Sequence, residues 1–179
     1  MGRLELYNVE TNLVPGLLQT PEYTRALTEL QVPDASKEQV DAQVNVRQER
    51  RRILTQEAPL QLWAIVAEGV LHHRVGGTEV MKAQLQALID DSRQSNIQLQ
   101  VLPWDDPMNA CLFGPFVVMS FPNSAETDII YTESPTSTVY YEEAPDVETY
   151  TTLFRRLNMA AANVGKSRAL VERAMEEMA

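Results

Sequence analysis

Apolar side chains recur at helical spacing in several segments of the chain. The first such stripe follows an i, i+3, i+4, i+7 pattern: Tyr23, Ala26, Leu27 and Leu30. This spacing is typical of an amphipathic helix, and Thr20 and Pro21 are favourable as its N-cap and first residue. The same reasoning predicts four further helices, the last capped by Ser167, over residues 36–56, 79–95, 147–161 and 167–178.

Alternating and continuous apolar runs predict the strands. Residues 97–102 alternate strictly, which is typical of a half-buried strand. Residues 60–68 are apolar on both alternating faces, which favours a strand buried on both sides. Three more strands are expected, separated by turns at 122–124 and 134–136, over residues 113–121, 127–133 and 137–143. Residues 4–14 form an extended segment that the Pro15-Gly16 corner turns into the first helix.

The order of these elements predicts an α+β fold in a single domain, residues 1–179. We expect a mostly antiparallel sheet of about five strands, with helices packed on one face and at both ends. The connection from strand 60–68 through helix 79–95 to strand 97–102 fits a parallel crossover.

Composition and charge narrow the class of protein. The chain has 179 residues, 44% of them hydrophobic, and one cysteine, Cys111. We expect no transmembrane helix, no signal peptide and no internal disulfide, and therefore a cytoplasmic location. The formal net charge of −10 argues against nucleic-acid binding by this chain alone, because neutralisation of phosphates supplies most non-specific affinity.

Two arginines share a helical stripe with apolar residues. On helix 36–56 one side carries Val40, Val44, Arg47, Arg51 and Leu54. An arginine on a core-facing stripe either pairs with a buried carboxylate or lines a polar pocket. Glu68, at the end of strand 60–68, is the candidate carboxylate, and both interpretations stay open.

The Pro15-Gly16 corner is the second half of this candidate site. Gly16 allows a close approach of the backbone, and Gln19 and Thr20 lie at a helix N-terminus, which favours anions. We expect the corner to pack against the ends of strand 60–68 and helix 36–56 and to form one wall of a polar pocket. The predicted ligand- or partner-binding residues are Gln19, Thr20, Tyr23, Arg47, Arg51 and Glu68.

The other residues that could form a metal, catalytic or phosphate-binding site give weaker signals. His72 and His73 would point about 100° apart on a helical turn and so would not share a metal ion. Cys111 has no indicated base, and Gly76-Gly77 lacks the Lys-Ser/Thr of a phosphate loop. We therefore expect no catalytic residue, no metal site and no cofactor. The alternative is a small hydrolase that pairs Glu68 with a second carboxylate such as Glu133.

Several motifs resemble, in order, those of a known family. They are VPGLLQTPEYTRAL (14–27), RQERRRIL (47–54), IVAEGVLHHRVGG (65–77), VMKAQLQALIDDSRQSNIQLQVLPW (80–104), FGPFVVMSFP (113–122) and IIYTES (129–134). The family is an actinobacterial domain of unknown function. It typically lies C-terminal to an XRE-type helix-turn-helix domain in transcriptional regulators of streptomycetes and their relatives.

The resemblance implies a non-catalytic module that senses a small-molecule effector or binds a small partner protein. It also implies a DNA-binding N-terminal domain that is absent from this chain, so that DNA would be bound only through that domain. Because such regulators read paired half-sites, we expect a homodimer. The apolar residues Met175 and Met178 of the last helix are the predicted dimer surface.

Overall fold

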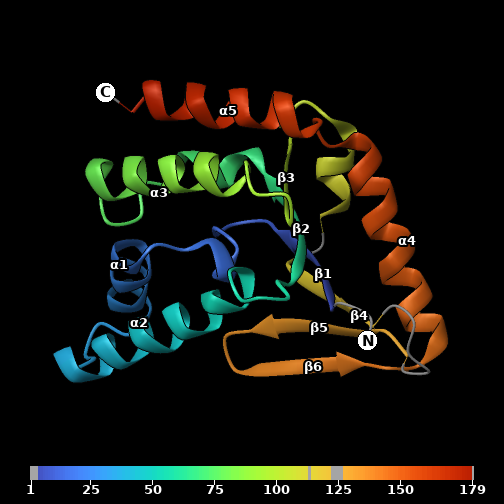
Figure 1. Ribbon diagram of the computed structural model, residues 1–179, viewed down its shortest axis with the longest axis horizontal. Coiled ribbons are helices and arrows are strands. Elements are labelled where there is room, and N and C mark those ends of the chain that lie inside the picture. The colour runs from blue at the N-terminus through green and yellow to red at the C-terminus, as the bar shows by residue number, and fades with distance from the viewer. Residues whose placement is uncertain (1–3, 113, 122–126, 179) are drawn as a thin grey trace.

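The computed structural model describes residues 4–112, 114–121 and 127–178, which contain one six-stranded sheet (Figure 1). The strands are β1 (Glu5–Glu10), β2 (Gln61–Ala67), β3 (Ile97–Leu102), β4 (Phe116–Ser120), β5 (Ile129–Ser134) and β6 (Ser137–Tyr141). Their order across the sheet is β3-β2-β1-β4-β5-β6. β1, β2 and β3 run parallel, whereas the pairings of β1 with β4, β4 with β5 and β5 with β6 are antiparallel.

In the described residues, five α-helices and four 3-10 turns connect and cover the strands. The helices are α1 (Pro21–Gln31), α2 (Lys37–Arg51), α3 (Thr78–Asp91), α4 (Ala144–Ala160) and α5 (Val164–Glu176). The turns are η1 (Gly16–Leu18), η2 (Arg52–Leu54), η3 (Glu68–His72) and η4 (Pro107–Cys111). None of the helices in the described part of the chain has the length and apolar character needed to cross a membrane.

The expected N-cap of α1 is confirmed, and α2 also begins at a capping residue. Thr20 Oγ1 accepts a hydrogen bond of 3.2 Å from the Tyr23 N–H, and Pro21 is the first residue of α1. Ser36 and Gln39 form a capping box, with bonds of 2.7 and 3.3 Å. Each cap satisfies N–H groups that have no partner within the first helical turn.

The expected number of strands was too low because the segment before the corner is itself a central strand. β1 lies between β2 and β4, with Val9 opposite Ile65 on one side and Phe116 on the other. Its partners are distant in sequence, so only tertiary pairing shows that this segment belongs to the sheet. The predicted parallel pairing of β2 with β3 is confirmed.

Helices cover both faces of the sheet, so the expectation of helices on one face was wrong. Leu62, Ala64 and Val66 of β2 pack in a core with α1, α3 and α5. Ile65, between them, packs in a second core with Phe154 and other residues of α4. Because β2 is apolar on both alternating faces, each face needs its own cover. Figure 1 shows α4 on the side of the sheet opposite α3 and α1.

Ser167 does not cap the last helix. The cap is Asn163, whose Oδ1 accepts a bond of 2.9 Å from the Lys166 N–H. Ser167 lies fully buried inside α5, where its hydroxyl accepts from the Val101 N–H at 2.9 Å and donates to the Ala162 carbonyl at 2.9 Å. The hydroxyl thus joins α5 to β3. The predicted turn at 134–136 is confirmed, and the one at 122–124 lies outside the described residues.

Candidate functional site

The Pro15-Gly16 corner forms turn η1, which leads from β1 to α1 and is bonded by side chains from α2 and α3. Gln84 of α3 donates to the Leu18 carbonyl and accepts from the Thr20 N–H, both at 2.8 Å. Gln48 of α2 donates to the Gln19 carbonyl at 3.2 Å. The expected packing of the corner against helix 36–56 is confirmed, and α3 is a further neighbour that the sequence did not predict.

The predicted site residues of the corner bond within the protein. The Gln19 amide donates to the Val14 carbonyl at 2.8 Å and accepts from the Thr24 hydroxyl at 3.2 Å. The Tyr23 hydroxyl, fully buried, accepts from the Val14 N–H at 3.2 Å. Burial raises the pKa of Tyr23, and the Val14 bond opposes that rise. Gln19, Thr20 and Tyr23 therefore hold the corner, and contact with a ligand stays a prediction for each.

The expected pairing of Arg47 or Arg51 with Glu68 was wrong. Arg51 donates instead to Asp91, at the end of α3, with bonds of 2.7 and 2.8 Å. Glu68 accepts from the Trp104 N–H at 2.9 Å and lies 3.4 Å from the guanidinium group of Arg173. Burial raises the pKa of Asp91, and the hydrogen bonds and charge of Arg51 oppose that rise. The tertiary structure places the end of α3 within reach of Arg51 on α2. It also places Arg173 of α5 next to Glu68.

Arg47 lies across the corner. A Cβ atom at position 16 would collide with the Arg47 guanidinium group, so the close approach expected at Gly16 is made by this side chain. Within the described parts of the chain, Arg47 forms no ion pair. Its positive charge acts on Glu10, the last residue of β1.

Glu10 is the carboxyl group that interacts with the charge of Arg47, which is the role predicted for Glu68. Burial, followed by the negative charge of Glu133, raises the pKa of Glu10 to about 7. The Asn8 amide, which donates to Glu10 at 3.3 Å, and the charge of Arg47 oppose the rise. Sequence reasoning missed Glu10, although the polar alternation of Asn8 and Glu10 at the end of an extended segment was a usable signal.

Five residues form a cluster that we call the carboxyl-edge cluster: Glu10, Arg47, Arg50, Tyr131 and Glu133. Burial raises the pKa of Tyr131; Glu133 and Glu10 raise it further, while Arg47 and Arg50 lower it. The other four groups are therefore within electrostatic reach of Tyr131, and Arg47 and Glu133 are also within reach of Glu10. The cluster joins the carboxyl end of β1 to β5 and α2, and the carboxyl ends of parallel strands are a common position for ligands. Its guanidinium groups suit an anion, and its carboxyl groups suit an amine.

The paired histidines make separate contacts. His72 stacks on Trp104 with ring centroids 4.7 Å apart, while His73 Nδ1 lies 3.0 Å from the Asn12 carbonyl oxygen. Across the residues that the structure describes, no group of three or more His, Cys, Asp or Glu side chains is placed to hold a metal ion.

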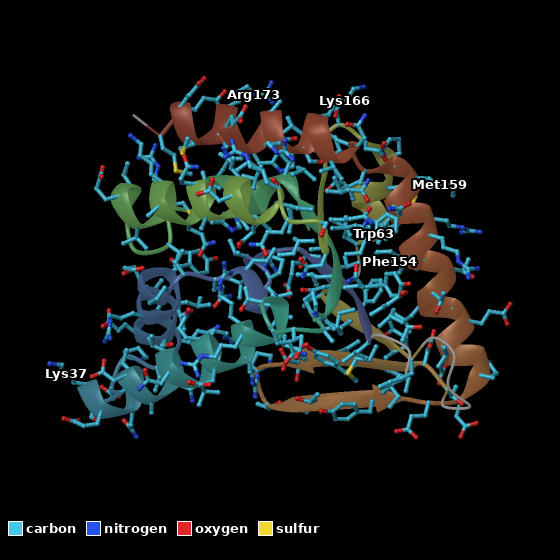
Figure 2. The ribbon with its side chains drawn as sticks, viewed as in Figure 1. Lys37, Trp63, Phe154, Met159, Lys166 and Arg173 are labelled. Carbon is cyan, nitrogen blue, oxygen red and sulfur yellow. The ribbon has the colours of Figure 1, made fainter. Side chains whose placement is uncertain are left out.

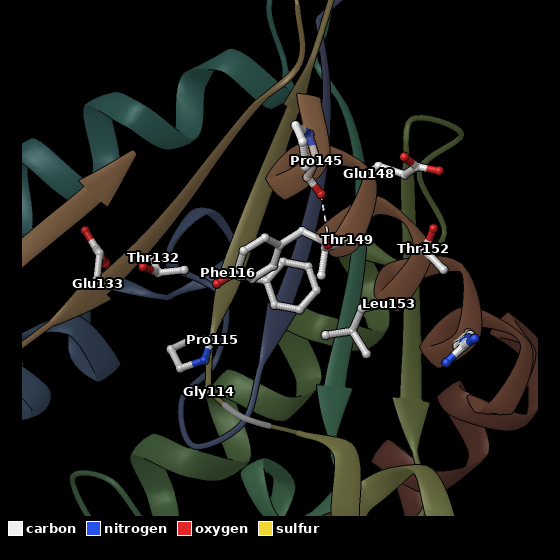
Figure 3. A pocket seen from close by; sticks show the side chains of 12 residues that line it. Gly114, Pro115, Phe116, Thr132, Glu133, Pro145, Glu148, Thr149, Thr152 and Leu153 are labelled. Atoms are coloured by element: carbon white, nitrogen blue, oxygen red, sulfur yellow. Dashed lines mark hydrogen bonds between the residues drawn. The ribbon is translucent and has the colours of Figure 1, made fainter. Parts of the chain in front are cut away.

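A cleft of about 910 Å³ lies between the β4–β5 pair and α4 (Figure 3). Its apolar wall includes Phe116, Tyr150 and Leu153, and the rings of Phe116 and Tyr150 lie 5.1 Å apart. Figure 3 shows the carboxyl group of Glu133 directed away from the Phe116 ring. Glu133 nevertheless lines the cleft and belongs to the carboxyl-edge cluster, so the two adjoin at β5.

Comparison with known proteins identifies the family of this chain. Residues 4–173 match the model of a protein family described as a domain of unknown function, DUF5753. Comparisons with curated proteins and with solved structures give no match. Because the family model covers nearly the whole chain, the protein belongs to the DUF5753 family.

Proposed function

We propose that this chain is a non-catalytic sensor or protein-interaction domain of a cytoplasmic XRE-type transcriptional regulator, and that its effector binds at the carboxyl-edge cluster. The observation that carries the proposal is the relation of Arg47 to Glu10. A partly buried carboxyl group has a pKa near 7, and the guanidinium group that acts on it has no ion-pair partner in the described residues. Charged groups held in this way are favourable contacts for a polar ligand.

Arg47 connects the proposed ligand site to the turn between β1 and α1. Its side chain rests on Gly16, in the turn between β1 and α1. A ligand that drew Arg47 toward the cluster would change the contact of α2 with the corner. A small-molecule effector, or a polar side chain of a small partner protein, would act in the same way. DNA binding would belong to an N-terminal helix-turn-helix domain of the whole regulator.

The proposed homodimer needs a surface other than the one expected. Met178 is 3% exposed and Met175 packs against the core, because α5 turns its apolar side toward α3. The edge strand β6 is the better candidate, since its outer backbone groups are open to pairing. Val139 and Tyr140 on this strand are 44% and 61% exposed.

The alternative, a small hydrolase with paired carboxylates, loses the support of Glu68, whose two oxygens contact Trp104 and Arg173. An enzyme would have to use Glu10 with Glu133 instead. One observation favours this version: the two carboxyl groups interact, and the pKa of Glu10 lies near 7. A carboxyl group with a raised pKa beside a second carboxyl group is what a general acid needs.

Ligand response of the intact regulator tests the proposal. We expect Arg47→Ala to abolish the response in a reporter assay while the melting midpoint falls by no more than about 4 °C, as for a loss of less than ~1 kcal/mol. Arg52→Ala removes an exposed arginine that pairs with Glu49; it is the matched control and should respond normally. Native mass spectrometry of the wild-type chain should detect a retained small molecule that the Arg47 variant lacks.

The enzyme alternative predicts different results. Chromogenic esters, phosphoesters and glycosides should be turned over by the wild-type chain, and Glu10→Gln should abolish that turnover. A normal reporter response of Arg47→Ala, together with such turnover, would replace the sensor proposal by the enzyme.

A further inference from the structure

A smaller cleft, of about 340 Å³, lies against the α4 face of the sheet. Six of its lining residues carry the inference: Tyr7, Trp63, Asp128, Thr151, Phe154 and Arg155. Figure 2 shows Trp63 and Phe154 between the sheet and α4. The cleft is on the face opposite α1 and α3, so it is separate from the corner and is not part of the proposed effector site.

Three aromatic rings form one wall of this cleft. The ring of Tyr7 lies 5.1 Å from that of Phe154 and 6.4 Å from that of Trp63. Trp63 and Phe154 meet edge to face, with centroids 6.2 Å apart and an angle of 84° between planes. Such a wall presents ring faces and edges against which a further aromatic ring can pack favourably.

The wall is held in place by one amide. Gln100, 7% exposed, accepts bonds of 2.6 Å from the indole N–H of Trp63 and from the Asn158 amide. Its own amide nitrogen donates to the Ala162 carbonyl at 3.0 Å. The orientation of Trp63 is thus set before a ligand arrives, which lowers the entropic cost of binding.

Thr151, which lines the cleft, carries a buried hydroxyl group that has no hydrogen-bond partner among the described residues. Thr151 Oγ1 has almost no exposed surface and makes no hydrogen bond to any residue that the structure describes. Thr149, on the same helix, instead donates to the Pro145 carbonyl one turn earlier, at 2.8 Å. Because a buried polar atom is costly unless it is bonded, a ligand toward which the Thr151 side chain turned would supply the missing hydrogen bond.

Opposite charges lie at the rim of the cleft. Asp128 and Arg155 both line it, and both act on the Tyr7 hydroxyl, Asp128 raising and Arg155 lowering the pKa of that group. In the part of the chain that the structure describes, the two residues form no ion pair with each other. A molecule with an amine and an acid group would find a separate counter-charge for each.

We propose that this cleft binds a small aromatic zwitterion of the size of an aromatic amino acid. Its ring packs on the Tyr7–Trp63–Phe154 wall, its ammonium group faces Asp128, its carboxylate faces Arg155, and one of its polar atoms bonds the Thr151 hydroxyl. The volume lies within the range of about 300–1,000 Å³ that small-molecule sites occupy.

Calorimetry with three related probes tests whether Asp128 and Arg155 bind the charged groups of the ligand. L-tryptophan has both groups, tryptamine lacks the carboxylate and indole-3-propionate lacks the amine. We expect L-tryptophan to bind about tenfold more tightly than either analogue, as for the loss of one charge-assisted hydrogen bond. Arg155→Gln should remove the preference over tryptamine, and Asp128→Asn the preference over indole-3-propionate. Arg156→Gln, which lines the larger cleft, is the matched control and should change neither preference.

Thr151→Val tests the hydroxyl with an isosteric side chain. The variant should melt at a higher temperature than the wild type in the absence of ligand, because an unpaired buried hydroxyl is removed. It should also bind L-tryptophan about fivefold more weakly, as for one lost hydrogen bond. Thr152→Val, at an exposed position, should bind normally.

Two results would overturn the inference. The first is the absence of saturable binding of L-tryptophan, L-tyrosine and L-phenylalanine at about 5 mM, enough to fill even a millimolar site. The second is binding that none of the Asp128, Thr151 and Arg155 variants weakens. Neither result would affect the proposed role of Arg47, which is tested by the reporter response of the regulator.

Discussion

Arg51 of α2 binds Asp91 of α3 through one guanidinium nitrogen, which lies 2.7 and 2.8 Å from the two carboxylate oxygens. The other terminal nitrogen donates to the Leu17 carbonyl of the corner at 3.0 Å. The side chain of Asp91 is 5% exposed and that of Arg51 is 28% exposed. One arginine therefore joins two helices and the turn that precedes α1, and it does so in a partly buried environment where removal of a partner is costly.

Arg51→Ala should lower the free energy of unfolding by about 2–3 kcal/mol, somewhat less than the ~3–5 kcal/mol of fully buried pairs, because Arg51 retains some contact with water. The loss follows from leaving the Asp91 carboxylate buried without its cation. Urea denaturation at neutral pH measures it. Arg52→Ala, whose ion pair with Glu49 is exposed, should lose less than ~0.5 kcal/mol. Equal losses in the two variants would mean that Arg51 does not support the corner.

Gln84→Leu should destabilise the protein by about 2–4 kcal/mol, because the Leu18 carbonyl and the Thr20 N–H would both be left buried without a partner. The substitution preserves the approximate volume of a fully buried side chain. Gln86→Leu, on the exposed side of the same helix, is the control and should have little effect. Thermal and urea denaturation measure both. A variant as stable as the wild type would show that water replaces the amide.

Glu10→Gln should stabilise the protein at alkaline but not at acidic pH. The folded state keeps the Glu10 proton up to a pKa of about 7, whereas the ordinary value is 4.5. Ionisation therefore opposes folding, so the contribution of Glu10 to wild-type stability is fully present below pH 4.5 and is lost as the pH rises through 7. The difference corresponds to about 3 kcal/mol at ~1.4 kcal/mol per pH unit.

Urea denaturation of Glu10→Gln and wild type at about pH 4 and pH 8 provides the measurement. The two proteins should be equally stable at the lower pH and should differ at the higher one. Glu57→Gln, at an exposed position, is the control and should show no such dependence. A constant difference at both pH values would mean that Glu10 titrates normally.

This chain alone should not bind DNA at physiological salt. Its net charge is −10, and in its most basic run Arg51 is bonded to Asp91 and Arg52 to Glu49. These ion pairs leave few cations free to neutralise phosphates. Gel-shift assays at about 150 mM salt, where charges beyond ~8 Å are screened, measure this. Retention of an operator-like duplex at nanomolar protein would contradict the prediction.

The chain should sediment as a dimer at micromolar concentration, and Tyr140→Lys should shift it to a monomer. Edge-strand pairing through β6 would place Tyr140, 61% exposed, beside the partner strand, and a lysine at an edge disfavours such pairing. Met159→Lys, at another exposed apolar position, is the control and should remain dimeric. A wild-type monomer would refute the dimer itself, and a dimeric Tyr140→Lys variant would exclude β6 as its surface.

Local sequence determined most elements because their signals act over a few residues. The cap of Thr20 and the capping box of Ser36 and Gln39 depend on side chains within one helical turn. The strict alternation of residues 97–102 gives β3 with its predicted bounds. Likewise the stripe on helix 36–56 shows which side of α2 faces the protein, since Val40 and Val44 are buried, as is Leu54 in η2.

Only the tertiary structure decided which distant groups meet. Arg51 binds Asp91 rather than Glu68 because the fold brings the end of α3 within reach of the Arg51 side chain. The charge of Arg47 acts on Glu10, which lies on β1, a central strand whose neighbours come from residues 61–67 and 116–120. Helical periodicity predicts that Arg47 and Arg51 face inward. Which charged group each arginine meets depends on the spatial order of the strands and helices. That order is set by burial of apolar faces over the whole chain, a non-local and non-directional effect that no short pattern encodes.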